Sequence, residues 1–327
     1  MQKRQRKPIN EGRTTLPLAS AVKSFMGHLE GSGKAKHTID SYRFDLLSFG
    51  EFLLAHRGKP TLDLKSLARK DLERYHDWLK LEGQKTNTRR RKLMTVRKLM
   101  HYLTARKKLD LDIAKKLLAP EKIERVPLTI DLALFREKIS GLPVESYFQA
   151  RNAALLLLLS DTGCSVSELS LIRWSAYEPL NTRLKFYGKA ERESKLRPDT
   201  ITALTQLKEL ARPIEKPSHH EDSDELLFIG FNRHGPMRIG KKALGITPRG
   251  IEMLVKGMSE TLGFPGVTPR VLRHSAVVDW YKSGIQPEEI QKRLGLKTAY
   301  TFRIYEPIFN AIRSKTEATS SPQTSPL

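Results

Sequence analysis

A basic segment over residues 84–108, QKTNTRRRKLMTVRKLMHYLTARKK, restricts the fold of this chain more than any other stretch. It contains ten lysines and arginines and no acidic residue. Four apolar residues follow helical spacing within it: Leu93, Val96, Met100 and Leu103. This spacing predicts a helix with one packed face and charge on the others. Such a charge run is usually a solvated face, but ten uncompensated positive charges repel one another. A nearby phosphate backbone would relieve that repulsion, which favours contact with nucleic acid.

The whole chain has the same charge bias. Its 327 residues include 58 lysines and arginines against 36 acidic residues, a formal net charge of +22. This excess favours a polyanionic partner, although charge alone does not separate nucleic acid from an anionic membrane. The longest leucine run, at 155–159, is too short for the roughly 18–20 residues of a membrane span. Residues 1–13 lack the apolar stretch of a secretory signal. We therefore expect a cytoplasmic, nucleoid-associated protein that binds DNA and no membrane.

Cysteine and histidine positions argue against a metal centre. The single cysteine, Cys164, excludes a disulfide framework and a cysteine-based zinc site. His219 and His220 lie in a polar segment, 213–225, with no third ligand at suitable spacing. We interpret this segment as a surface loop and expect neither a metal nor a cofactor.

Composition along the chain predicts two domains. Residues 1–13 form a basic flexible tail, and 14–117 form a helical domain that includes the basic helix. A proline- and charge-rich linker covers 118–127. A second domain follows over 128–315, and a Ser/Thr/Pro-rich tail, 316–327, is predicted to be disordered.

Several elements can be placed within these domains. Tyr42, Leu46, Phe49 and Leu53 share one face of a predicted helix that ends near residue 58. In the second domain, the apolar stretch 151–163 is predicted to be helical. The pattern over 183–197 predicts a β-hairpin, and from residue 227 onward it is mostly helical. The two helices over 271–296 would also suit a helix-turn-helix reader, although any short amphipathic pair produces that pattern.

Four sequence boxes give this chain its most specific signal. They are DTGCSVSELSLIRW, FYGKAERESKLR, TPRVLRHS and LGLKTAYTFRIY, and they begin at residues 161, 186, 268 and 294. In this order and spacing they resemble the catalytic boxes of the tyrosine recombinase (phage integrase) family. Residues 37–49 and 86–103 resemble the helical core-binding domain of that family. The resemblance implies a mainly α, two-domain DNA clamp with a small β-hairpin or sheet in the second domain.

The chemistry implied by this resemblance is DNA strand cutting and rejoining. A tyrosine hydroxyl attacks a DNA phosphate and forms a 3′-phosphotyrosine, which conserves the bond energy without ATP or metal. Arginines stabilise the transition-state charge, and a hairpin lysine protonates the leaving 5′-oxygen. By the resemblance, Tyr305 is the nucleophile, Lys189 the hairpin lysine and Arg273 the second arginine. His274 completes the Arg-His-Ser box and supports it rather than transferring a proton.

Three of the six usual catalytic positions depart from the family pattern. Ser165 stands where the first arginine is usual, Arg270 replaces a histidine, and Leu296 replaces a second histidine. Losing one charge contact to the transition state typically costs about 3–4 kcal/mol. We hypothesise that Arg270 restores the positive charge that Ser165 cannot supply.

Basic side chains of the first domain are candidates for phosphate contact. They are Lys85, Arg89, Arg90, Arg91, Lys92, Arg97 and Lys98, with Arg43 on the preceding helix. The resemblance also implies dimers or tetramers on DNA, with the C-terminal segment packing on a neighbouring subunit through Ile308, Phe309 and Ile312. A partner recombinase is a further candidate.

Two functions stay open at this stage. One is a recombinase or integrase that acts through Tyr305, slow or dependent on a partner. The other is a catalytically silent relative that binds, bends or regulates DNA. A helix-turn-helix regulator outside the family would leave Lys189 and Tyr305 unexplained.

Overall fold

The computed structural model of the protein describes residues 15–58, 63–187, 191–211, 225–239, 242–296 and 298–320. The chain divides into two compact units, Met1–Glu124 and Arg125–Leu327. Both are mainly helical, and the second also holds small antiparallel sheets, so the predicted fold class is confirmed. Among the described residues, no helix is both long enough and apolar enough to cross a membrane.

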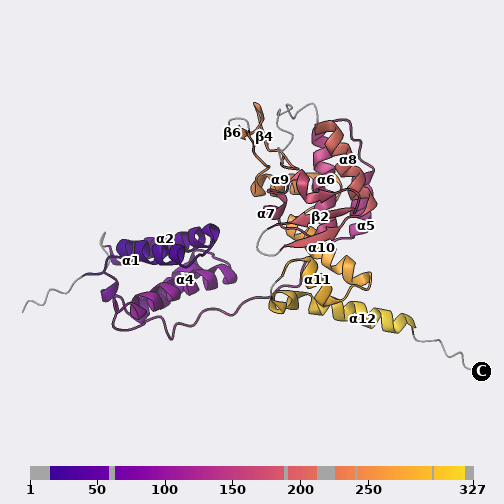
Figure 1. Cartoon of the computed structure of the whole chain (residues 1–327). Helices are drawn as coiled ribbons and strands as arrows, with labels where there is room; N and C mark the ends of the chain where they lie inside the picture. Colours follow the sequence, from indigo (N-terminus) through magenta and orange to yellow (C-terminus); the bar gives the residue numbers. More distant parts are fainter. Residues whose placement is uncertain are drawn as a thin grey trace, which may run out of the picture. The chain divides into compact units, whose positions relative to one another are not determined.

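The described part of the first unit contains helices and no strand. Its elements are α1 (Leu18–Gly31), α2 (Lys36–Arg57), η1 (Leu64–Ser66), α3 (Arg69–Leu81) and α4 (Thr86–Ala105). Figure 1 shows α1, α2 and α4 packed together in indigo and purple. The basic helix predicted over 84–108 is therefore present as α4 and is slightly shorter at both ends.

Apolar residues at helical spacing fill the core of this unit, as the sequence predicts. Leu46, Phe49 and Leu53 on α2 are at most 1% exposed. Val96 and Met100 on α4 are fully buried in the same cluster. Burying a side chain of this size contributes roughly 1.5–3 kcal/mol. This packed face therefore orients α4 and leaves its basic residues on the remaining sides.

A connector without helix or strand, residues 117–131, joins the two units. Asn87 on α4 holds its first half, because Asn87 Nδ2 donates to Ile123 O at 3.0 Å and Ile123 N donates to Asn87 Oδ1 at 3.0 Å. Near its end, Ile130 N donates to Ser275 Oγ at 3.0 Å. The connector is thus attached to each unit by side-chain hydrogen bonds.

The predicted tails lie largely outside the described residues, which exclude 1–13 and 321–327. The first part of the C-terminal tail is helical, because α12 (Glu306–Ser320) includes residues 316–320. The prediction of disorder is corrected there. These residues continue α12 without a breaker, and the next proline comes only at Pro322.

The second unit mixes helices with short strands. It opens with α5 (Leu132–Ser140), α6 (Tyr147–Thr162), α7 (Val166–Leu169) and η2 (Trp174–Ala176). An antiparallel sheet of β1 (Tyr177–Glu178), β2 (Arg183–Phe186) and β3 (Arg192–Lys195) precedes α8 (Pro198–Ala211). Two small sheets follow, β4 (Phe231–Asn232) with β5 (Gly235–Pro236), and β6 (Arg238–Ile239) with β7 (Lys242–Ala243). The remainder comprises α9 (Pro248–Thr261), α10 (Pro269–Lys282), α11 (Pro287–Arg293), η3 (Ala299–Tyr305) and α12.

Helix α6 lies at the centre of this unit. Its leucine run, 155–159, is at most 2% exposed, since α5, α8 and α10 pack around it (Figure 1). Gly163 ends the helix with φ of 56°, a left-handed conformation that favours glycine. A Cβ atom at this position would lie 3.2 Å from Leu294 Cδ2 and 3.3 Å from the Trp280 ring. The end of α6 therefore meets α10 and the turn after α11 at close range.

The strand predictions are partly confirmed. The hairpin predicted over 183–197 is present as β2 and β3, with Leu184 opposite Ser194. The prediction of mostly helical structure from residue 227 is wrong at first, because β4 to β7 precede α9 (Figure 1). A turn at residues 233–234 and Gly235, whose φ is 115°, fold this stretch back into a hairpin.

Helix α12 is anchored to its own unit. Phe309 is 4% exposed, and its ring stacks on Tyr281 with 3.8 Å between the ring centroids. The prediction that Phe309 packs on a neighbouring subunit is therefore wrong for this conformation, because its ring is buried within its own unit. Ile308 and Ile312 remain partly exposed.

Candidate active site

Helix α10 brings three of the predicted site residues together. Thr268 caps its start, and Thr268 Oγ1 accepts a hydrogen bond from Val271 N at 3.3 Å. Arg270, Arg273 and His274 follow at spacings of three and four, which places them on neighbouring parts of the helix surface.

His274 connects Tyr305 to Arg270. The Tyr305 Oη lies 2.6 Å from His274 Nδ1, and Arg270 Nε donates to His274 Nε2 at 3.2 Å. Tyr305 ends η3 and is 3% exposed, with the rings of Phe302 and Phe309 beside it. The fold therefore places three of the predicted site residues in one line of contacts.

The hydrogen-bond partners determine the tautomer of His274. An arginine can only donate, so His274 Nε2 accepts the bond from Arg270. Burial, together with the positive charges of Arg270 and Arg273, lowers the pKa of His274 to about 4. The ring is therefore neutral near pH 7, and its single proton is on Nδ1. In this arrangement His274 Nδ1–H donates to Tyr305 Oη, so His274 cannot accept the proton of the tyrosine.

Burial dominates the ionisation of Tyr305. It raises the pKa of the hydroxyl to about 12, and the charges of Arg273 and Arg270 oppose this rise. The hydroxyl is therefore protonated at neutral pH. The hydrogen bond from His274 favours the phenolate, because it stabilises the negative charge that forms when the proton leaves.

Arg273 is half-buried between two backbone segments. Its NH1 donates to Gly163 O at 2.5 Å, and its NH2 donates to Leu294 O at 3.1 Å. Burial lowers its pKa, and Glu168 opposes that effect. These two bonds within the described chain use two of the five N–H donors of a guanidinium. The remaining donors suit an oxyanion.

A cavity of about 640 Å³ lies against the α10 arginines. It is lined by Cys164, Ser165, Val166, Arg249, Glu252, Met253, Lys256, Thr268, Pro269, Arg270 and Arg273. Four cationic side chains and one carboxylate border it, so it attracts anions. Neither Tyr305 nor His274 lines it in the described structure.

The three departures from the family pattern have different surroundings. Ser165 caps α7, because its Oγ accepts from Glu168 N at 3.2 Å and its N donates to Glu168 Oε2 at 2.7 Å. Leu296 is partly buried and packs against the main apolar cluster. Arg270 is exposed and contacts His274. Lys189 lies outside the described residues.

The loop predicted over 213–225, with His219 and His220, also lies outside the described residues apart from Glu225. Among the side chains that the structure does describe, no group of three or more His, Cys, Asp or Glu is arranged to hold a metal ion.

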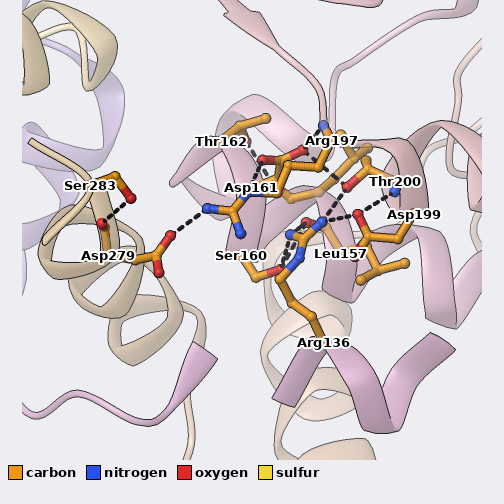
Figure 2. A network of polar contacts seen from close by, with 11 residues as sticks. Arg136, Leu157, Ser160, Asp161, Thr162, Arg197, Asp199, Thr200, Asp279 and Ser283 are labelled. Carbon is orange, nitrogen blue, oxygen red and sulfur yellow. Dashed lines mark hydrogen bonds and ion pairs between the residues drawn. The ribbon is translucent and has the colours of Figure 1, made fainter. Parts of the chain in front are cut away.

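A charged network attaches the hairpin to α10 (Figure 2). Arg197, which follows β3, donates through its backbone N to Asp161 Oδ2 at 2.7 Å, and its guanidinium pairs with Asp279 on α10. Next to it, Arg136 on α5 pairs with Asp199 on α8. Burial raises the pKa of Asp161, while Arg136 and Arg197 oppose the rise. The network links the strand that ends the hairpin to the helix that carries the arginines of the site.

Tertiary contacts compensate part of the charge on α4. Arg91 NH1 lies 2.5 Å from Asp45 Oδ1 of α2, and the Asp45 side chain is 1% exposed. Arg90 NH1 donates to Pro120 O at 2.7 Å, and Lys92 Nζ donates to Ser48 Oγ at 2.8 Å. The prediction of ten uncompensated charges is corrected here, because these partners come from segments distant in sequence.

The other predicted DNA-contacting residues are distributed around the same unit. Lys98 contacts Tyr42, and Arg89 lies beside His76 with 3.4 Å between nitrogens. Lys85 is exposed just before α4, and Arg97 is half-exposed. The pairs Arg90–Arg97 and Arg91–Lys98 are each seven residues apart and form two adjacent stripes on the helix surface away from the core. Arg43 is exposed on α2 and pairs with Asp40 at 3.5 Å.

Sequence reasoning missed five charged residues around the site, one of which is Glu252 in the cavity wall. Arg249 and Lys256 of α9 line the cavity. Buried Arg192 and half-buried Glu168 form an ion pair, with 3.2 Å between Arg192 Nε and Glu168 Oε1. Arg192 lies within the FYGKAERESKLR box, but its direction could not be predicted without the register of β3.

Comparison with models of known protein families shows which family this chain belongs to. Residues 137–310 match the model of the phage integrase family, and residues 22–107 match the phage integrase N-terminal SAM-like domain. The chain belongs to the phage integrase family. The predicted resemblance to tyrosine recombinases is thereby confirmed for both units.

Relatives of this phage integrase family member are themselves recombinases. Tyrosine recombinase XerD of Listeria innocua is 25% identical over 277 residues, which are 84% of this chain and 88% of the relative. Tyrosine recombinase XerC of Herpetosiphon aurantiacus is 27% identical over 295 residues, 90% of this chain and 92% of the relative. The fold is similar to that of XerH site-specific recombinase bound to a palindromic difH substrate in a post-cleavage complex. The TM-score is 0.68 at 18% identity, over 93% of this chain and 84% of XerH.

Proposed function

We propose that this protein is a site-specific tyrosine recombinase that binds double-stranded DNA and cuts and rejoins strands through Tyr305. The line of contacts from Tyr305 through His274 to Arg270, beside a cationic cavity, carries this proposal. Membership of the phage integrase family supports it. The XerH structure, which holds a difH substrate after cleavage, shows that a protein of similar fold acts on DNA.

The proposed reaction is a phosphoryl transfer. The Tyr305 oxygen attacks the phosphorus of a DNA phosphodiester, and the bond from phosphorus to the 5′-oxygen breaks. The products are a 3′-phosphotyrosine and a free 5′-hydroxyl, and the reverse attack by a 5′-hydroxyl rejoins the strand. Arg273 and Arg270 stabilise the negative charge on the nonbridging oxygens. Lys189 protonates the leaving 5′-oxygen.

His274 has a supporting role in this scheme. Its Nδ1–H donates to the Tyr305 oxygen and stabilises the phenolate that develops during the attack. The tyrosine proton therefore leaves on the side away from His274 and passes to a nonbridging oxygen of the phosphate. This role agrees with the low pKa of His274, because a neutral ring keeps the required tautomer through the reaction.

The nucleophile must move before it can react. Tyr305 is 3% exposed and does not line the cavity among the described residues. We propose that η3 and α12 shift when DNA or a neighbouring subunit binds, which brings the Tyr305 oxygen to the phosphate. Cleavage would then be slow without DNA-bound assembly into a dimer or tetramer, or without a partner recombinase.

The two units are proposed to clamp the duplex. The stripes formed by Arg90, Arg97, Arg91 and Lys98 on α4 would contact phosphates on one side, and the cavity on the second unit would hold the scissile phosphate. With roughly 6–10 phosphates neutralised, affinity would fall about 10³–10⁵-fold between about 50 and 200 mM salt. A flat salt response would contradict the clamp.

A catalytically silent DNA-binding relative is the second candidate. Two observations favour it. Ser165 supplies no positive charge to the phosphate, and Leu296 can neither donate nor accept a hydrogen bond. The hydroxyl of Tyr305 is buried in this conformation. Such a protein would recognise a site and regulate or bend DNA without cutting it.

A suicide DNA substrate separates the two candidates. DNA is first selected by binding to this protein and then nicked near the scissile phosphate, so that the cut fragment diffuses away. A covalent protein–DNA band that Tyr305→Phe abolishes would establish the recombinase. Tight and specific binding without a band, also after addition of a candidate partner recombinase, would establish the silent binder.

A further inference from the structure

The proposed phosphate site lacks a positive charge at position 165, where the sequence has a serine. Ser165 is short, and its side chain is used to cap α7. Glu168, which closes that cap from the other side, keeps its second carboxylate oxygen for another partner. This partner comes from a different element of the fold.

Arg192 on β3 occupies the place beside Glu168. Its side chain is 3% exposed, and its Nε lies 3.2 Å from Glu168 Oε1. Its NH1 donates to Arg293 O at 2.7 Å, and its guanidinium lies over the Phe186 ring at 4.1 Å. The remaining nitrogen, NH2, is buried and has no hydrogen-bond partner among the described residues. A buried donor of a charged group without a partner is costly, so this nitrogen suits an anionic ligand.

Arg192 and Arg273 belong to one electrostatic cluster. Arg192 donates a hydrogen bond to Arg293 O, and Arg273 donates one to Leu294 O. These are the two adjacent carbonyls at the end of α11. Burial has the largest effect and lowers the pKa of Arg273, Glu168 opposes that effect, and the charge of Arg192 also lowers the pKa. One carboxylate, Glu168, therefore balances the buried guanidinium of Arg192 and the half-buried one of Arg273. Exposed Arg270 adds a third positive charge beside Arg273. The cluster keeps a net positive charge that an oxyanion would neutralise.

We propose that Arg192 supplies, from β3, the guanidinium charge that position 165 lacks at the phosphate site. The positive charge at that site thus comes from Arg192, Arg273 and Arg270. This inference rests on the proposed function only in naming a DNA phosphate as the ligand. Arg192 does not line the cavity, so its charge acts through a poorly screened interior unless DNA binding uncovers its free NH2.

A charge-coupling experiment tests this role without requiring cleavage. All proteins carry Tyr305→Phe, and each phosphate of the selected DNA is replaced singly by an uncharged methylphosphonate. The phosphate that the site holds is the one whose replacement by methylphosphonate removes the difference in affinity between the Arg273→Gln variant and the protein that retains Arg273. Arg192→Gln is then expected to weaken binding to unmodified DNA about tenfold and to leave binding to DNA neutralised at that phosphate within about twofold.

A matched control and a rescue variant separate charge from folding. Coupling here means a larger loss of affinity for unmodified DNA than for DNA neutralised at that phosphate. Arg183→Gln is expected to show no coupling, since Arg183 lies on β2 of the same hairpin with a side chain that is 55% exposed. Adding Ser165→Arg to Arg192→Gln is expected to restore the coupling, since a guanidinium at position 165 can pair with Glu168. Thermal unfolding reports whether each variant folds. If Arg192→Gln does not fold, the double variant decides: a folded protein with full coupling supports the proposal, and failure to fold refutes it.

Equal losses of affinity for charged and neutralised DNA, without rescue by Ser165→Arg, would show that Arg192 is only structural. The suicide substrate decides separately whether the unmodified chain cleaves DNA. A chain that does not cleave but shows the coupling would remove the enzymatic proposal and leave the assignment of Arg192 intact.

Discussion

Protonation of His274 should destabilise the second unit below neutral pH. In the folded chain, Arg270 Nε points at His274 Nε2, so a proton on that nitrogen would place two donors face to face. The pKa of His274 is about 4 in the folded state, against an ordinary value of 6.5. Because the folded pKa is the lower one, the unfolded chain binds the proton first as the pH falls. Stability is therefore unaffected by this group above about pH 6.5 and decreases from there toward pH 4.

The size of the effect follows from the shift. A difference of one pKa unit corresponds to about 1.4 kcal/mol, so the full loss is about 3 kcal/mol near pH 4. Between about pH 8 and pH 5, the expected loss is roughly 2 kcal/mol. His274 is 8% exposed, so solvent screening reduces this figure little.

Urea unfolding of the full chain measures this loss. Fluorescence of Trp174 and Trp280 reports on the second unit, and Trp78 reports on the first. The same titration of His274→Gln is the control, since glutamine cannot titrate and can still accept from Arg270. The free energy of unfolding of the unmodified chain should fall relative to this variant by roughly 2 kcal/mol between about pH 8 and pH 5. Parallel curves for the two proteins would refute the assigned tautomer and the buried neutral ring.

Three further outcomes are expected. Arg270→Ala should slow covalent-complex formation on the suicide substrate about 10²–10³-fold, whereas Arg183→Ala should not; an unchanged rate would exclude Arg270 from the phosphate site. Arg90→Ala combined with Arg97→Ala should reduce the slope of log affinity against log salt by roughly 1.8, and an unchanged slope would place the DNA elsewhere. Arg136→Ala should destabilise the second unit by about 3–5 kcal/mol in urea unfolding, because it removes the ion pair with Asp199 and takes a compensating positive charge from buried Asp161. Arg183→Ala, at an exposed ion pair, should cost at most about 1 kcal/mol; equal losses would contradict a structural role for the network in Figure 2.

Short-range patterns account for the parts of the fold that were predicted correctly. The spacing of Leu46, Phe49 and Leu53 predicts the buried face of α2, because helical periodicity is a local property. The leucine run of α6 predicts a buried helix for the same reason. The strands β4 to β7 were missed because each is two residues long, too short for an alternating pattern. Their pairing depends on turns rather than on periodicity.

The sequence by itself determined the family, the helical character of both units and the order of the four boxes that contain Tyr305, Arg273 and Lys189. These follow from local spacing and from the identity of residues within short motifs. Only the tertiary structure decided which charges are compensated, because the partner of Arg91 is Asp45, on a different helix. Only the tertiary structure brings His274 into contact with Tyr305, which lies 31 residues further along the chain. It also placed Arg192, from a strand, beside the carboxylate of Glu168. Such contacts depend on how elements pack across the core, and no local pattern of residues records that packing.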